Sequence, residues 1–332
     1  MKRPDPSNIS SQGHSDAPSA AGSHLKEEVT QSPSQTIFLR LSMLLQKEEL
    51  FAYTLIAPAL IILTIFVAYP FILGIWLSLS DKLVGVPGNF VGLKNFTHIV
   101  GSQIFRQTAR NTFVYTGVAV AFKLVLGVGL ALVLNRQFPF KRFVRATILL
   151  PWIIPTALSA LAWFWMYDAT FSVINWTLRN LKLIRFNIQW LGKPGLALTS
   201  VIIVNIWRGT PFFAISFLAG LQTISPELDD AANIDGAGAW AKFWYVTLPL
   251  LKPVIVVVVL FSLILTFADF QLVYVLTRGG PANSTHLFAT LSYQVALGAG
   301  RLGEGAAIAL FMFPVLFMMV VFQLLYIRKG GY

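Results

Sequence analysis

Three charged side chains lie inside long apolar stretches of the sequence: Lys123, Arg208 and Asp269. A charge at membrane depth costs several kcal/mol, so such side chains usually face a cavity or a partner. Asp269 can accept hydrogen bonds from hydroxyl groups, and Arg208 can pair with a carboxylate. These residue types fit a solute pathway or a structural Arg208–Asp269 ion pair. For Lys123 we expect packing against a partner subunit or snorkelling.

The sequence lacks the patterns that enzyme chemistry needs. Cysteine is absent from the 332 residues, and the four histidines show no HExxH spacing. No GxxxxGK[ST] phosphate loop occurs, so any ATP must bind to another chain. We therefore expect no catalytic residues, no metal site and no cofactor bound by this chain.

Composition indicates a membrane protein. Hydrophobic residues make up 56% and charged residues 12%, whereas soluble domains carry about 25% charged residues. The net charge of +11 is scattered between apolar stretches, which fits basic loops near lipid headgroups better than nucleic-acid binding.

Six apolar segments each reach the ~20 residues that a helix needs to cross a bilayer. They predict an all-α, polytopic membrane protein with six transmembrane helices, at about residues 51–79, 112–134, 146–167, 196–221, 253–277 and 306–327. Prolines inside them are tolerable, because neighbouring helices satisfy the freed carbonyls.

The first 50 residues are predicted to lie outside the membrane domain, which spans residues 51–329. Residues 1–36 are rich in Ser, Pro, Gln and Gly, a composition typical of a disordered tail. Residues 37–46 favour a short amphipathic helix at the membrane surface.

Six spans place both termini on one side of the membrane. Only the loop at 135–145 is both short and dense in Lys and Arg. The positive-inside rule therefore favours a cytoplasmic N-terminus without deciding the orientation.

The segment between the fourth and fifth spans, residues 221–253, predicts two short helices. Ser225 and Pro226 form a helix start, and three acidic residues follow where the helix dipole favours negative charge. An Asp-Gly pair ends this helix, and a second helix at 239–247 leads into the fifth span. Two interpretations are open. The segment is either a projecting helical element whose small residues allow close approach of a partner, or an ordinary loop at the membrane interface. Its informative positions are Glu227, Asp229, Asp230, Ala231, Ala232, Asp235, Gly236 and Ala237.

This segment resembles the EAA loop of permeases from ATP-binding-cassette (ABC) importers. The matching residues are Asp230-Ala231-Ala232, Gly236 and Val246-Thr247-Leu248-Pro249, with Asp230 standing where the family has Glu. Other stretches are similar to the sugar-importing, maltose-type branch: AYPFILGIWLSLS, FVGLKNF, RNTFVY, LGVGLALVLNR, ILLPWIIP, VNIWRGTPF, LAGLQTI and VLTRGGP. The resemblance covers about residues 50–329.

The resemblance implies a subunit of the bacterial cytoplasmic (inner) membrane with both termini and the EAA coupling loop in the cytoplasm. The loop would insert into a cleft on an ATPase dimer that binds ATP and Mg²⁺. It further implies a second permease subunit and an extracytoplasmic sugar-binding protein, with a carbohydrate crossing by alternating access.

The resemblance also implies where the substrate binds. The matching positions are Trp152, Thr156, Asn205, Arg208, Gly209, Phe212, Leu265 and Asp269. Spacing supports part of this set, because Trp152 and Thr156 are four residues apart and Asn205 shares a helix face with Arg208, Gly209 and Phe212. Aromatic rings suit the C–H-rich faces of a sugar, and the polar groups suit its hydroxyls.

Two alternatives stand beside a sugar importer. A permease for glycerol phosphate or a polyol would share the same pattern. An ion-coupled secondary transporter often shows inverted repeats, which are not evident between the first three and last three spans.

Overall fold

The computed structural model describes residues 48–329. The predicted disordered tail and the predicted interfacial helix lie outside the described residues. Within them the structure is helical, and its only β pairing is an isolated bridge between Ser80 and Phe90. The all-α class is therefore confirmed. The chain divides into two units, residues 1–65 and 66–332, which are described separately.

The first unit contains helix α2 (Glu48–Leu63), which includes Pro58. A π-helical segment, η1 (Thr64–Ala68), continues it into α3 (Tyr69–Ser78). Ala52–Ser78 forms one apolar stretch of 27 residues, long enough to cross a membrane. Its large apolar side chains are exposed, as expected of a surface that meets lipid or another protein.

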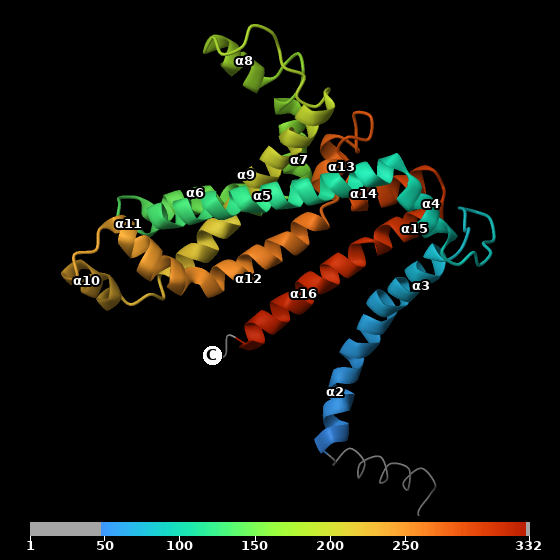
Figure 1. The fold of residues 1–332 in the computed structure, drawn as a ribbon, viewed down its shortest axis with the longest axis horizontal. Coiled ribbons are helices and arrows are strands. Elements are labelled where there is room, and N and C mark those ends of the chain that lie inside the picture. The colour runs from blue at the N-terminus through green and yellow to red at the C-terminus, as the bar shows by residue number, and fades with distance from the viewer. Residues whose placement is uncertain (1–47, 330–332) are drawn as a thin grey trace, which may run out of the picture. The chain divides into compact units, whose positions relative to one another are not determined.

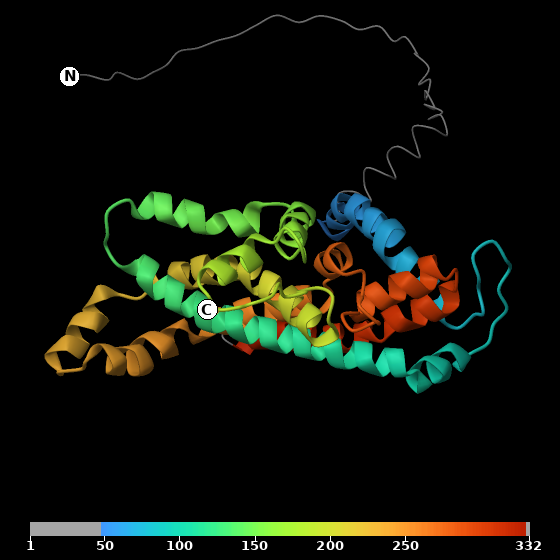
Figure 2. The ribbon, with the colours of Figure 1, turned by 90° about the horizontal axis from the view of Figure 1, so that it is seen from above.

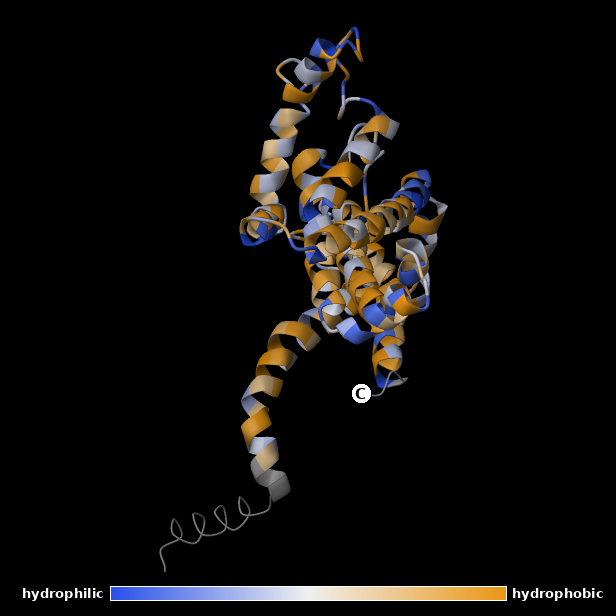
Figure 3. Ribbon diagram, turned by 90° about the vertical axis from the view of Figure 1, so that its left-hand side faces the viewer, coloured by the Kyte–Doolittle hydropathy of each residue, from blue (hydrophilic) through white to orange (hydrophobic). Residues whose placement is uncertain are grey.

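The second unit holds the other candidate spans, with short helices between them (Figures 1 and 2). The long helices are largely hydrophobic, and many hydrophilic residues lie in the turns and short helices (Figure 3). The spans are α5 (Gln103–Asn135), the pair α6 (Lys141–Ile153) and α7 (Thr156–Met166), α9 (Pro194–Leu221), the run of α11 (Ala239–Lys242), η2 (Phe243–Thr247) and α12 (Leu248–Phe267), and the run of α15 (Leu302–Leu310) and α16 (Met312–Lys329). The short elements are α4 (Lys94–Gly101), α8 (Val173–Asn180), α10 (Pro226–Ile234), α13 (Gln271–Leu276), α14 (Phe288–Tyr293) and η3 (Gln294–Gly298).

The predicted third span, residues 146–167, is not one straight helix. α6 ends at Ile153 and α7 begins at Thr156, and the two are bent by 90°. Pro155 explains the break, because its ring disfavours helical geometry at Ile154 and it has no N–H to donate. Ile154 accordingly has extended backbone (φ −61°, ψ 132°).

The predicted fifth span, residues 253–277, is wrong at both ends. The helical run begins at Ala239, so the expected second loop helix is continuous with the span rather than separate. It ends at Phe267, and α13 starts only after Ala268, Asp269 and Phe270. No Pro or Gly marks this break in the sequence. The second span also begins earlier than predicted, at Gln103.

The core of the second unit forms where α5 packs along α9. Tyr115, Val201, Val204 and Phe213 are all at most 1% exposed. Gly127 allows the close approach, because a Cβ there would lie 2.4 Å from the Cβ of Phe213. This packing holds α9, which carries four of the predicted substrate positions, against α5.

Candidate functional site

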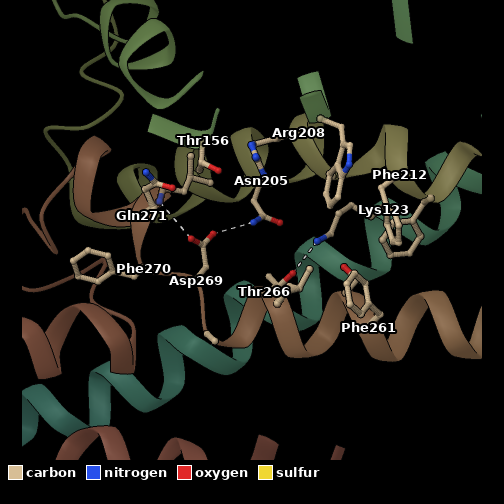
Figure 4. A pocket seen from close by; sticks show the side chains of 17 residues that line it. Lys123, Thr156, Asn205, Arg208, Phe212, Phe261, Thr266, Asp269, Phe270 and Gln271 are labelled. Carbon is tan, nitrogen blue, oxygen red and sulfur yellow. Dashed lines mark hydrogen bonds between the residues drawn. The ribbon is translucent and has the colours of Figure 1, made fainter. Parts of the chain in front are cut away.

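A cavity of about 340 Å³ opens between the helices of the second unit (Figure 4). Its lining comes from α5, α6, α7, α9 and α12, together with the break after α12 and the start of α13. The lining includes all eight predicted substrate positions: Trp152, Thr156, Asn205, Arg208, Gly209, Phe212, Leu265 and Asp269. The structure thus brings together residues that are up to 117 positions apart in the sequence (152 to 269).

Asp269 lies in the break between α12 and α13, where its carboxylate meets donors from several elements. Oδ2 accepts a 2.6 Å hydrogen bond from the hydroxyl of Tyr115 and a 3.2 Å bond from Nδ2 of Asn205. Oδ1 accepts from the backbone N–H of Leu272 at 3.3 Å. Asn205 Nδ2 also donates to Tyr115 at 2.8 Å. A carboxylate with three donors is held in one orientation.

Arg208 does not pair with Asp269. The ion pairs of the described residues do not include these two side chains, so the alternative of a structural Arg208–Asp269 pair is not realised here. The guanidinium carbon of Arg208 instead lies 5.7 Å from the centre of the Trp152 ring. Its buried Nε has no hydrogen-bond partner.

Two aromatic rings form an apolar wall of the cavity. Trp152 and Phe212 stack with centroids 4.9 Å apart and planes inclined by 21°. Phe261 extends the wall, 5.7 Å from Phe212. The uncovered parts of these rings offer apolar contact area beside polar groups that can form hydrogen bonds.

Lys123 also lines the cavity. Of the two expectations for this residue, packing against a partner subunit or snorkelling, snorkelling is wrong. Lys123 is only 3% exposed, and its Nζ donates a 2.9 Å hydrogen bond to Oγ1 of Thr266. Its aliphatic stem lies against Gly209, where a Cβ would be 2.4 Å from the Cδ of Lys123. Gly209 is therefore needed for this side chain to fit between α5 and α9.

Tyr115 holds two cavity residues in place, and sequence reasoning missed it. It is fully buried in α5 and bonds both Asp269 and Asn205. Its partners lie 154 and 90 residues away, and a tyrosine in an apolar helix usually reads as packing. Only the RNTFVY stretch marked its neighbourhood.

The predicted coupling segment forms α10 at one end of the second unit (Figure 1). Ser225 caps the helix by accepting from the N–H of Glu227 at 3.3 Å, and Pro226 is the first helical residue, as predicted. Gly236 ends it with φ +74°, and the N–H of Ala237 donates to the carbonyl of Ala232 at 2.9 Å. Such a left-handed glycine is a common helix ending.

The side chain of Lys242 links α10 to the following helix, α11. Lys242 Nζ lies 3.0 Å from Oδ1 of Asp229 and donates to Oδ1 of Asn233 at 3.1 Å. The other acidic residues of the segment, Glu227, Asp230 and Asp235, are exposed, as is Ala231, whereas Ala232 is buried. Ile234 and Tyr245 are 87% and 83% exposed. The surface of this segment is therefore open to a partner.

Among residues 48–329, no group of three or more His, Asp or Glu side chains is placed to hold a metal ion.

Comparison with known proteins gives consistent matches. Residues 123–329 match the family described as "Binding-protein-dependent transport system inner membrane component". The chain is 34% identical over 292 residues to the trehalose/maltose transport system permease protein MalF of Thermococcus litoralis, covering 88% of this chain and 97% of that one. It is 35% identical over 270 residues to the sulfoquinovosyl glycerol transport system permease protein SmoG of Agrobacterium fabrum, covering 81% and 87%.

The fold is similar to that of a solved importer. A chain of a bacterial ABC transporter involved in import of the acidic polysaccharide alginate superposes with a TM-score of 0.74 at 24% identity, covering 88% of this chain and 100% of that one. The family match and these relatives together show that the chain is a multi-pass membrane permease belonging to the family of inner-membrane components of binding-protein-dependent ABC transport systems.

Proposed function

We propose that this chain is the permease subunit of an ATP-driven importer that moves a carbohydrate by alternating access. The observation that carries the proposal is the cavity, which is lined both by the stacked Trp152 and Phe212 rings and by the polar groups of Asn205 and Asp269. Apolar ring faces beside fixed hydrogen-bonding groups match the two-sided chemistry of a sugar. The names of the relatives MalF and SmoG point to the same class of solute.

The proposal includes partners that the chain needs. A solved relative of this fold is described in complex with an alginate pentasaccharide-bound periplasmic protein, which supports delivery by an extracytoplasmic binding protein. A second permease subunit would complete the pathway. An ATPase dimer would bind ATP and Mg²⁺ and contact α10, whose capped, exposed helix is suited to docking.

The proposed topology follows from the coupling segment. With α10 in the cytoplasm, both termini and the basic loop at 135–145 are cytoplasmic as well. The loop's cations then face the leaflet where positive charge is favoured. Cysteine labelling is direct, because the chain contains no native cysteine. Ser225→Cys should react only when the reagent reaches the cytoplasmic face.

The test of function is uptake by vesicles that contain the complete transporter. We expect ATP-dependent uptake of a saccharide that stops when the ATPase subunit is omitted. Uptake that persists without the ATPase would indicate an ion-coupled transporter instead. Uptake of glycerol 3-phosphate or a polyol in preference to any saccharide would favour that alternative substrate class.

Two variants test the cavity itself. Asp269→Ala and Arg208→Ala should change the substrate preference or raise the KM while the complex still assembles. Arg328→Ala is the matched control, because Arg328 is exposed near the end of α16. Loss of assembly with an unchanged preference in the surviving complex would assign the two residues a structural role.

A further inference from the structure

We propose that the carbohydrate passing through this cavity is acidic, carrying an anionic group that binds beside Arg208 and Lys123. The inference deepens the proposed function and rests on it. It concerns the charge of the substrate, which the stacked aromatic wall does not determine.

The cavity contains more cations than carboxylates. Its lining includes two basic side chains, Lys123 and Arg208, and one acidic side chain, Asp269; every other lining residue is uncharged. An excess positive charge inside a membrane is costly unless a counter-charge accompanies it. A solute with one negative charge supplies that counter-charge and leaves the occupied cavity neutral.

Asp269 does not neutralise either cation by direct contact. Its carboxylate accepts hydrogen bonds from Tyr115, Asn205 and the backbone of Leu272. Three of its roughly four acceptor positions are thus used by neutral donors. Neither Arg208 nor Lys123 lies within ion-pair distance of it.

The two cations keep donors available for a ligand. Arg208 has a buried Nε with no partner, and its guanidinium lies over the Trp152 ring. Lys123 donates to Thr266, which uses one of its three N–H groups. A guanidinium binds a carboxylate through two N–H groups along one edge of its plane, so Arg208 has the donors that an anionic group needs.

An unpartnered acceptor completes the site. Oδ1 of Asn205 is buried without a hydrogen-bond partner, one helical turn from Arg208. It can accept from a sugar hydroxyl while the anionic group of the same sugar meets Arg208. An acidic sugar ring therefore satisfies the unpaired donor, the unpaired acceptor and the stacked rings at once.

The experiment uses the complete transporter in proteoliposomes with its binding protein. The probes are pairs of saccharides that differ only in a carboxylate for a hydroxymethyl group, such as glucuronosyl-glucose and cellobiose, together with longer uronate and neutral oligosaccharides. Substrate-stimulated ATP hydrolysis and uptake are measured for each pair. We expect stimulation by acidic members and at least about tenfold less by their neutral partners, as for loss of a charge-assisted hydrogen bond.

Variants separate the permease site from selection by the binding protein. Arg208→Gln should lower acidic-substrate transport at least about tenfold, whereas Arg208→Lys, which keeps the charge but loses the planar pair of donors, should lower it by less. Arg328→Gln is the matched control, and binding of the sugar to the isolated binding protein should be the same throughout. A similar loss in Arg208→Lys and Arg208→Gln would overturn the inference, because charge would not be the property that matters.

The remaining outcomes are also distinct. Stimulation by neutral members equal to or above that of acidic members would overturn the inference while leaving the proposed function intact; a carboxylate from the second permease would then be the counter-charge. No stimulation by any saccharide would contradict the proposed function itself.

Discussion

The hydroxyl of Tyr115 and the carboxylate of Asp269 are joined by a 2.6 Å hydrogen bond across 154 residues of sequence. The bond links α5 to the break between α12 and α13, and Asn205 of α9 bonds both groups. Three segments that line the cavity are therefore held in register by one polar cluster.

Tyr115→Phe should weaken both the fold and transport. Removal of the hydroxyl takes a donor from Asp269 and an acceptor from Asn205, and leaving buried polar groups unsatisfied costs about 1–3 kcal/mol. Thermal unfolding of the purified complex and the KM for uptake would measure the two effects. Tyr53→Phe, at a 68% exposed position, should change neither. Wild-type values for Tyr115→Phe would show that the cluster does not organise the cavity.

Asp229→Asn should reduce the coupling of ATP hydrolysis to uptake more than it reduces stability. Its ion pair with Lys242 is partly exposed, and such pairs contribute only about 0–1 kcal/mol to stability. The pair nevertheless fixes α10 against α11. We would measure the ratio of solute transported to ATP hydrolysed. The exchanged double variant Asp229→Lys with Lys242→Asp should restore part of that ratio. An unchanged ratio in Asp229→Asn and no recovery in the double variant would argue against a role for this ion pair in coupling.

Gly127→Ala should destabilise the packing of α5 on α9. The added Cβ would lie 2.4 Å from the Cβ of Phe213 and 3.3 Å from its backbone carbon, and overpacking of this kind costs about 1–3 kcal/mol. Gly129→Ala is a close control, because nothing lies within 4 Å of a Cβ at that position. Unfolding temperatures in detergent should fall for the first variant and stay level or rise for the second. Equal temperatures would contradict the close contact.

His286 should make the protein less stable in mild acid. Burial lowers the pKa of its imidazole below the ordinary value of about 6.5, so the fold favours the neutral ring. The unfolded chain binds a proton below about pH 6.5, which means this contribution is present above that pH and is lost as the pH falls toward the lower folded pKa. The ring contacts Thr290 and lies against Gly279.

The measurement is the unfolding temperature between pH 8 and pH 5. His286→Gln should flatten the decline below about pH 6.5, whereas His98→Asn, at an exposed histidine side chain, should leave it in place. An unchanged decline in His286→Gln would assign the acid sensitivity to other groups.

Sequence reasoning located the spans and the eight cavity positions, because hydropathy reports membrane burial directly and the motifs that carry these residues resemble a known family. It missed Tyr115, since nothing near residue 115 reveals partners on α9 and after α12. It also misjudged Lys123, because only the packed structure shows that Gly209 leaves room for its stem. The break at 268–270 contains no Pro or Gly, so tertiary contacts rather than local preference end α12 there.

The helical run from Ala239 to Phe267 is continuous. It begins just after the turn that follows α10 and ends two residues before Asp269. At 1.5 Å per residue, its 29 residues form a helix about 43 Å long. A push or a twist applied at Ala239 is therefore carried by one helical run as far as Phe267, whereas the turn that contains Gly236 and Gly238 separates this run from α10. The π-helical turn at Phe243–Thr247 holds one residue more than an α-turn. It therefore rotates α12, with Leu265 and Thr266, about the helix axis relative to an uninterrupted α-helix.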